Sequence, residues 1–269
     1  MTSLPDFPGA VGLSQLEVYP WPTADHEHGG SPHMHLVCAE CYVVVSGRGR
    51  LETLNYKGLT TTELHPGDVV WFTPGTIHRA INDEDLRVIV VMQNSGLPEA
   101  GDAVMTFPPE YLSPETYPDA VSLLDTDGNP SHERAQARRD LAVAGFTELK
   151  RQWRRGNRSA YEDFCAAAVR IVQPRLEAWQ KTVSDGALAA AHTALRQIDA
   201  LRQCRFDHLF SAEISRIARP SPQTLGMCGF LRAYDPARRA GSSTGPKSDL
   251  LAADVDEHVR PGADLPGLS

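Results

Sequence analysis

The chain has 269 residues, of which 22% are charged and 41% hydrophobic, a composition typical of a soluble globular protein. Its net charge of −8 argues against unspecific binding to nucleic acid, which requires clustered Lys and Arg. No run of about 18 apolar residues is present, so we expect no membrane-spanning segment.

The N-terminal stretch lacks a basic region followed by an apolar one, so it does not resemble a signal peptide. The cytoplasm is therefore the expected compartment. The five cysteines are an odd number without the spacing of a disulfide framework, so we expect free thiols.

Residues 15 to 107 are rich in strand signals. Short apolar or alternating runs recur there: CYVVVSG, RLETLN, DVVWFT, HRAIN and LRVIVVMQ. Segments rich in Gly, Pro, Asn and Asp separate these runs: SGRG, HPGD, TPGT and NDED. Short strands at such close intervals predict an antiparallel sandwich or barrel.

The pattern becomes helical from Ser131 to about Gln203, where apolar residues recur every three or four positions. Three helices are expected, and Pro174 should kink or end the second. Leu188, Leu195, Ile198 and Leu201 form the apolar stripe of the third. Residues 225–235 are apolar again and predict a strand or a buried edge segment.

Two histidines lie two residues apart, and a strand would place the side chains of His33 and His35 on one face. Glu40 has the wrong parity for that face. A tight turn at residues 36–39 would let Glu40 begin a second strand beside the first, so that the three side chains meet. His78 follows the turn TPGT. Three neutral imidazoles and one carboxylate can hold a divalent metal and leave coordination positions open.

These stretches resemble the paired motifs of the cupin superfamily. His33, His35, Glu40 and Gly47 stand at the spacing of the first motif, although its opening glycine is displaced. The second motif is matched by four further positions, Gly67, Gly75, His78 and Asn82, with Thr73 where proline is usual. The match covers about a third of the chain.

The resemblance implies a fold that is mainly β: a cupin double-stranded β-helix, or jelly-roll barrel, followed by an α-helical region. We expect a cupin barrel domain over residues 1–110, a helical extension over 111–235 that packs on the barrel, and a flexible tail over 236–269. The resemblance also implies that His33, His35, Glu40 and His78 bind one divalent metal ion: Fe, Mn, Ni, Cu or Zn. Cupins commonly pair, so a homodimer is expected.

Other residues are weaker candidates. Tyr42 shares the parity of Glu40, so it is either a contact near the metal or substrate or a packed core tyrosine. Cys38 and Cys41 form a C-x2-C pair, but no second pair exists to complete a zinc site. A second His-x-His, at residues 26–28, is expected in an exposed loop. Catalytic residues are not predicted.

Three functions are compatible with this site. The first is an oxygen-dependent, dioxygenase-type oxidoreductase acting on a small oxygenated organic substrate. The second is a metal-dependent isomerase, epimerase or lyase acting on a sugar or keto acid. The third is a non-catalytic small-molecule-binding or sensor protein. The complete ligand set favours an enzyme, and the lack of a Lys and Arg cluster near the motifs favours the oxidoreductase.

Overall fold

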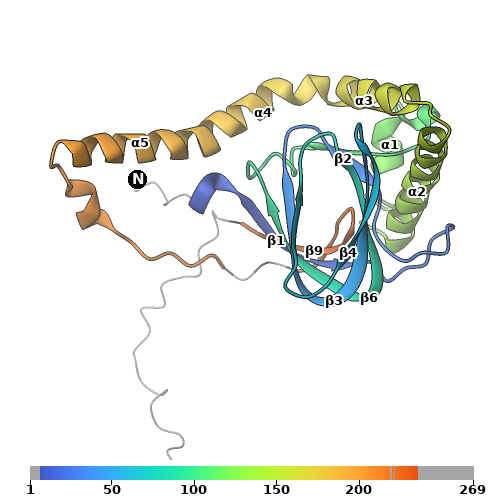
Figure 1. Cartoon of the computed structure of the whole chain (residues 1–269), viewed down its shortest axis with the longest axis horizontal. Helices are drawn as coiled ribbons and strands as arrows, with labels where there is room; N and C mark the ends of the chain where they lie inside the picture. The colour runs from blue at the N-terminus through green and yellow to red at the C-terminus, as the bar shows by residue number, and fades with distance from the viewer. Residues whose placement is uncertain (1–6, 219, 221, 236–269) are drawn as a thin grey trace, which may run out of the picture.

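The computed structural model describes residues 7–218, 220 and 222–235. The tail expected over residues 236–269 lies outside the described residues. A twisted antiparallel sheet packs beside a group of helices, and two of these helices continue past the sheet as a long arm (Figure 1). None of the helices in the described part of the chain is long and apolar enough to cross a membrane.

Within the described residues, nine strands form one folded antiparallel sheet. The strands are β1 (Gly12–Val18), β2 (His33–His35), β3 (Glu40–Asn55), β4 (Gly58–Leu64), β5 (Val69–Phe72), β6 (Ile77–Met92), β7 (Ala103–Met105), β8 (Thr224–Leu225) and β9 (Gly229–Tyr234). The expected jelly-roll architecture is confirmed. The apolar segment expected at residues 225–235 forms β8 and β9, and β9 pairs with β1.

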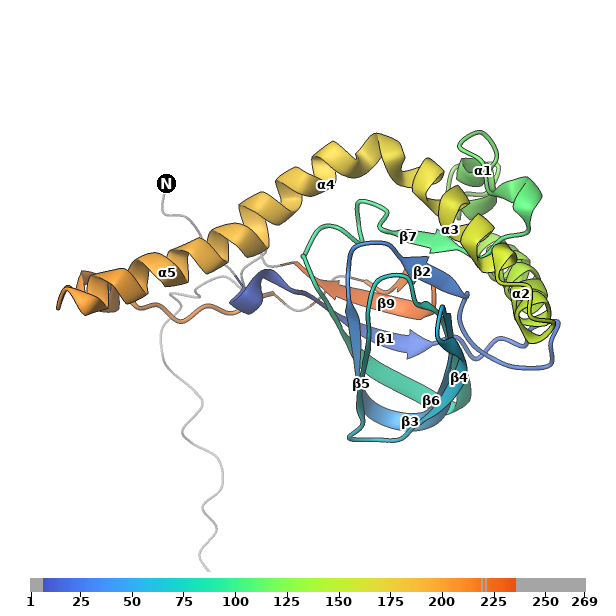
Figure 2. The same ribbon diagram turned by 45° about the horizontal axis from the view of Figure 1, so that its top comes forward.

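The long strands β3 and β6 each contribute to two layers of the fold. In one layer the order is β5, the start of β3, the end of β6, β1, β9 and β8. In the other it is β7, β2, the start of β6, the end of β3 and β4. Figure 2 shows these strands wrapping around a common interior.

The expected breaks inside β3 and β6 were wrong. The segments SGRG and NDED do not end strands, because β3 and β6 stay paired from Glu40 to Leu54 through three register shifts. Gly47 adopts a φ of +75° at this bend, and a Cβ atom there would lie 2.2 Å from the carbonyl oxygen of Glu84. Glycine therefore permits a β-bulge where the sequence pattern predicted a turn.

The helices are α1 (Tyr117–Val121), α2 (His132–Arg154), α3 (Ser159–Val172), α4 (Leu176–Val183) and α5 (Ala189–Arg202). As expected for Pro174, α3 ends at Val172 and a 3-10 turn follows. A π-helical turn, Ser184–Leu188, joins α4 to α5, so the expected third helix extends the arm instead of standing alone.

The helices α2 and α3 supply part of the main hydrophobic core, through Phe146, Trp153, Phe164 and Val172. Helix α2 approaches the barrel closely at Gly145, where a Cβ atom would lie 1.9 Å from the carbonyl oxygen of Thr106. The Thr106 hydroxyl donates to the carbonyl oxygen of Ala142 on α2. This contact brings one face of α2 to the strands that carry the histidines.

Candidate metal centre

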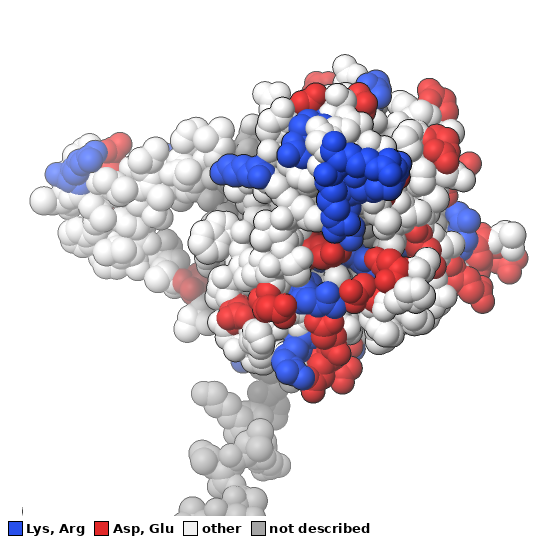
Figure 3. All heavy atoms as spheres, turned by 45° about the vertical axis from the view of Figure 1, so that its right-hand side comes forward, with Lys and Arg blue, Asp and Glu red and all other residues white. Residues whose placement is uncertain are grey.

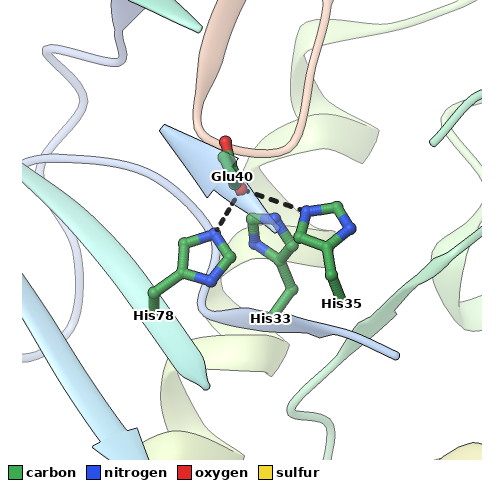
Figure 4. Close-up of side chains that lie close together, drawn as sticks. All are labelled: His33, His35, Glu40 and His78. Carbon is green, nitrogen blue, oxygen red and sulfur yellow. Dashed lines mark ion pairs between the residues drawn. The ribbon is translucent and has the colours of Figure 1, made fainter. Parts of the chain in front are cut away.

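Four side chains converge inside the barrel. One ligand atom from each of His33, His35, Glu40 and His78 lies within 4.8 Å of the others, and all four residues are buried. The Oε2 atom of Glu40 lies 3.1 Å from Nε2 of His35 and 3.2 Å from Nε2 of His78. Figure 4 shows the three imidazoles on one side and the Glu40 carboxylate facing them. The four residues singled out by the sequence pattern therefore lie together in the structure.

The four side chains come from opposite layers of the barrel. His33 is the direct cross-strand partner of His78, on β2 and β6. Glu40 begins β3, where its register partners are Phe72 on β5 and Met92 at the far end of β6. The expectation that Glu40 starts a strand beside β2 was wrong, because among the described strands β2 pairs with β6 and β7. The turn at residues 36–39 carries the chain across the interior.

A buried carboxylate, Asp102, holds this turn. Its side-chain oxygens accept hydrogen bonds from the backbone N–H groups of Leu36, Val37 and Cys38, at 3.1, 2.9 and 2.8 Å. The same carboxylate lies 3.5 Å from Nδ1 of His35. Asp102 thus holds the crossing of the chain and places its charge beside the His35 ring. Sequence reasoning missed it, since it stands more than 60 residues from the motif it supports.

Two of the three imidazoles are oriented by hydrogen bonds through Nδ1. In His33 this atom donates to the Ser31 carbonyl oxygen at 2.9 Å, and in His78 it faces the Thr76 carbonyl oxygen at 3.2 Å. A carbonyl oxygen only accepts, so the proton must be on Nδ1 in both rings. The Nε2 lone pairs then point into the cluster, the tautomer that metal-ligating histidines adopt when a partner holds the other nitrogen.

The cluster also perturbs the pKa values of its members. Burial, with the neighbouring histidines, holds the pKa of His33 well below its usual value. Burial alone would lower the pKa of His35, but the neighbouring carboxylates of Asp102 and Glu40 raise it to about 9. Burial would raise the pKa of Glu40, yet His78 and His35 hold it well below normal. A neutral His33 and an ionised Glu40 are the forms that bind a metal.

The donor set passes a simple test of fit. The Oε2 atom of Glu40 and the Nε2 atom of His78 are buried and have no hydrogen-bond partner within the described residues. Both are acceptors that face each other, so neither satisfies the other without a shared proton or cation. A divalent ion between them would satisfy both, together with the two remaining imidazoles.

A cavity of about 260 Å³ opens beside this cluster. His33, His35 and Glu40 form part of its wall, and apolar side chains from β1, β6 and β9 form another part. Two further lining residues, Arg138 and Cys228, come from far along the chain. The Sγ atom of Cys228 lies 4.0 Å from Nδ1 of His33. Periodicity in α2, or in the segment around the turn that precedes β9, does not point to the cluster, so the sequence contained no signal for these two.

Tyr42 is fully buried within the hydrophobic core. Its hydroxyl lies 3.8 Å from Sγ of Cys228, and burial, with Cys228 and Glu40, raises the pKa of Tyr42 well above its usual value. The side chain is not among those that line the cavity. A contact between Tyr42 and the substrate stays a prediction. The structure shows the Tyr42 side chain in the buried core, near Glu40 and Cys228.

The weaker candidates lie outside the cluster. Cys38 is buried in the turn held by Asp102, and all five cysteines are free thiols. Position 28 forms an isolated bridge to Pro22 in the loop between β1 and β2. Neither Cys38 nor the histidines of that loop belong to the group of possible metal ligands.

Folded antiparallel layers with an inward-facing group of three histidines and one glutamate define a barrel of the cupin type. Residues 23–92 match the family model of the cupin domain, Cupin_2. Residues 23–92 therefore form a cupin domain, which confirms the resemblance stated for the two histidine motifs. No curated protein sequence matches the chain.

Several solved structures resemble the barrel. A protein with a double-stranded β-helix domain from Klebsiella pneumoniae is 20% identical over 33% of this chain and 66% of its own, with a TM-score of 0.27. The capsular polysaccharide assembling protein CapF from Staphylococcus aureus is 22% identical over 35% and 25%, with a TM-score of 0.27. A cupin 2 conserved barrel domain protein from Salinispora arenicola is 22% identical over 37% and 76%, with a TM-score of 0.27. The chain spans less than two thirds of the first two.

Proposed function

We propose that this protein is a mononuclear-metal enzyme that acts on a small oxygenated organic substrate, as an oxygen-dependent oxidoreductase of the dioxygenase type. One observation carries the proposal. Three imidazoles and one carboxylate converge, and His33, His35 and Glu40 of this group line a cavity large enough for a small molecule. Such a centre leaves coordination positions open toward that cavity.

In this proposal His33, His35 and His78 hold the ion through Nε2, and Glu40 holds it through its carboxylate. Ligand type is compatible with Fe, Mn, Ni, Cu or Zn. The ion would supply Lewis acidity toward a carbonyl or enediol oxygen and, where it is redox-active, reactivity toward dioxygen. The residues of the chain orient the donors: Asp102 for His35, and the Ser31 and Thr76 carbonyls for the other two rings.

The apolar walls of the cavity support a substrate with a hydrophobic body. Leu16, Val90 and Leu231 line it, so a bound molecule would displace water from beside the ligands. An isomerase acting on a phosphorylated sugar would be expected to bring several cations to this wall. Among the described lining residues, Arg138 is the one Lys or Arg side chain. This argues against an isomerase acting on a phosphorylated sugar and is compatible with the oxidoreductase.

Metal analysis of protein purified without an affinity tag, followed by assays of the iron-loaded form, tests the proposal. We expect one metal ion per chain and oxygen consumption with enolic or hydroxylated aromatic compounds. A carbonyl shift without oxygen would instead support the isomerase. Unchanged function in His78→Ala would indicate the non-catalytic binding protein. A chain that contains no metal, and takes none up, would refute the metalloenzyme.

Small molecules, not nucleic acids, are the partners we propose. Figure 3 shows Lys and Arg side chains gathered in one patch on the helical side of the molecule, with acidic side chains close to it. The end of α2 and the turn after it carry exposed arginines, but contacts within the chain already engage some of them. Arg151 pairs with Glu148, and Arg158 lies over the Trp153 ring at 3.4 Å from its centroid.

We also propose a homodimer. The apolar stripe of the arm is exposed, with Leu188, Leu195, Ile198 and Leu201 between 46% and 57% accessible. Covering such a stripe with a second copy would remove apolar surface from water. Light scattering after gel filtration tests this, and a monomer at micromolar concentration would contradict it.

The free cysteines support a reducing compartment such as the cytoplasm.

A further inference from the structure

Arg138 differs from the other buried cations of the protein. Among the described residues, four Lys or Arg side chains are buried: Arg79, Arg138, Arg139 and Lys150. Three of them have a carboxylate partner, since Arg79 pairs with Asp25, Arg139 with Asp140 and Lys150 with Glu52. Arg138 is 6% exposed and has no carboxylate within 4.0 Å among the described residues.

The guanidinium of Arg138 is only partly hydrogen-bonded. Its Nη2 donates to the carbonyl oxygen of Gly226 at 2.6 Å. Its Nε is buried and has no acceptor within the described residues. Guanidinium stays charged in proteins, so this position combines an unneutralised charge with an unused donor. Both features are costly in a buried site unless an anion is bound there.

This guanidinium belongs to the cavity of the metal cluster. Arg138 lines the same 260 Å³ space as His33, His35 and Glu40. It reaches this space from α2, outside the matched cupin domain, because Gly145 and Thr106 let that helix lie against the barrel. Figures 1 and 2 both show α2 beside the layer that contains β2.

The acidic residues nearby do not neutralise Arg138. Glu40 faces the imidazoles, and Glu99, which also lines the cavity, is exposed. Arg138 also borders a hollow on the outer side of α2 that contains Glu110, Glu115 and Asp119. All three are exposed, and none forms an ion pair with the guanidinium.

We infer that Arg138 binds the carboxylate of the substrate, so that the cavity accepts small organic carboxylates with an apolar body. This inference rests on the proposed function and names its substrate class. A carboxylate carries the one negative charge that a single guanidinium can match. A phosphate carries about −1.5 to −2 at neutral pH, and the described lining offers no second Lys or Arg. Apolar side chains of β1, β6 and β9 then contact the rest of the molecule.

Calorimetric titration of the full-length protein, loaded with redox-inert Zn(II), tests the inference. The probes are acetate, benzoate and 3-phenylpropanoate, each compared with its neutral amide: acetamide, benzamide and 3-phenylpropanamide. At least one carboxylate should bind about tenfold or more tightly than its amide, as a charge-assisted hydrogen bond predicts. Arg138→Met should lose that preference while the zinc content stays the same.

Arg134→Met is the matched control, because Arg134 is exposed one turn earlier on α2 and does not line the cavity. It should keep the preference for carboxylates. Unchanged carboxylate affinity in a folded Arg138→Met would overturn the inference, since the anion would then bind through the metal alone. So would equal affinity for carboxylate and amide, or no carboxylate binding, in the zinc-loaded wild type.

Two further measurements keep the result interpretable. If Arg138→Met does not fold, Arg138→Lys keeps the charge but lacks Nε, and about a tenfold loss of carboxylate affinity is expected. Unchanged affinity in that variant would overturn the inference. If the wild type takes up no zinc, the proposed function fails, and the titrations of metal-free protein still test Arg138 through the same preference for carboxylate over amide.

Discussion

The carboxylate of Asp102 lies 3.5 Å from Nδ1 of His35 while it also accepts three backbone N–H groups from residues 36–38. One buried side chain therefore connects the orientation of a proposed ligand to the turn that brings Glu40 across the barrel. This arrangement makes the geometry of the cluster depend on a residue that is not itself among the four converging side chains.

Replacing Asp102 should weaken metal binding without removing any ligand. We expect Asp102→Asn to lower metal affinity by about 10- to 100-fold, the usual effect of losing the partner that orients a ligating histidine. Competition with a chromogenic chelator measures the affinity. Asp127→Asn, at an exposed aspartate, is the control and should bind as the wild type does. Equal affinity in both variants would argue against the positioning role of Asp102.

Removing the metal should lower the stability of the barrel. An ion that binds only the folded state adds about 2.7 kcal/mol to the free energy of unfolding when its concentration is 100 times the dissociation constant. Dialysis against a chelator should therefore lower the midpoint of urea unfolding, and added metal should restore it. His78→Ala should show a much smaller difference. A chelator effect of the same size in that variant would point to another site.

Gly47 should be intolerant of substitution. Gly47→Ala adds a Cβ atom 2.2 Å from the Glu84 carbonyl oxygen at a φ of +75°, so we expect a loss of about 3 kcal/mol or more. Gly128→Ala is the matched control, since its φ is +79° but nothing lies within 4 Å of the new atom. It should cost about 1 kcal/mol. Equal losses in urea unfolding would mean that the bulge relaxes around the side chain.

The ion pair between Asp25 and buried Arg79 should stabilise the folded protein near neutral pH, and this contribution should be lost in acid. Burial would raise the pKa of Asp25, but hydrogen bonds from Arg79 and Thr23 lower it from 3.8 to about 2. Because the folded pKa is the lower one, this stability is present above about pH 4 and is lost as the pH falls toward 2. The shift corresponds to about 2 kcal/mol.

Comparison of the wild type with Asp25→Asn at pH 6 and pH 2 measures this contribution. The variant should be less stable at pH 6, and the difference in the free energy of unfolding should shrink by about 2 kcal/mol at pH 2. Asp127→Asn again serves as the control. A difference that stays constant across this range would show that the Asp25 carboxylate does not titrate as expected.

The strand-rich first part, the helices after residue 131 and the side chains that converge were predictable from the sequence. The spacing of His33 and His35 reflects the alternation of side chains along a strand, which is a local property. The strand breaks were not predictable, because Gly47 can serve a turn or a bulge and only pairing with β6 decides between them. The sequence predicted the apolar stripe of α5, but the spacing of apolar residues does not reveal whether they are buried, and in the structure they are exposed.

By itself, the sequence determined the alternating pattern of the barrel strands and the chemical types and spacing of the four proposed ligands, since both depend on neighbours close along the chain. Only the tertiary structure decided that Glu40 faces the histidines from the opposite layer, that Asp102 holds the crossing turn, and that Arg138 borders the same cavity without a counterion. Glu40 and His78 meet across two layers, the Asp102 contacts join residues at least 64 positions apart, and Arg138 places a charge out of water. All three follow from how the layers and helices pack.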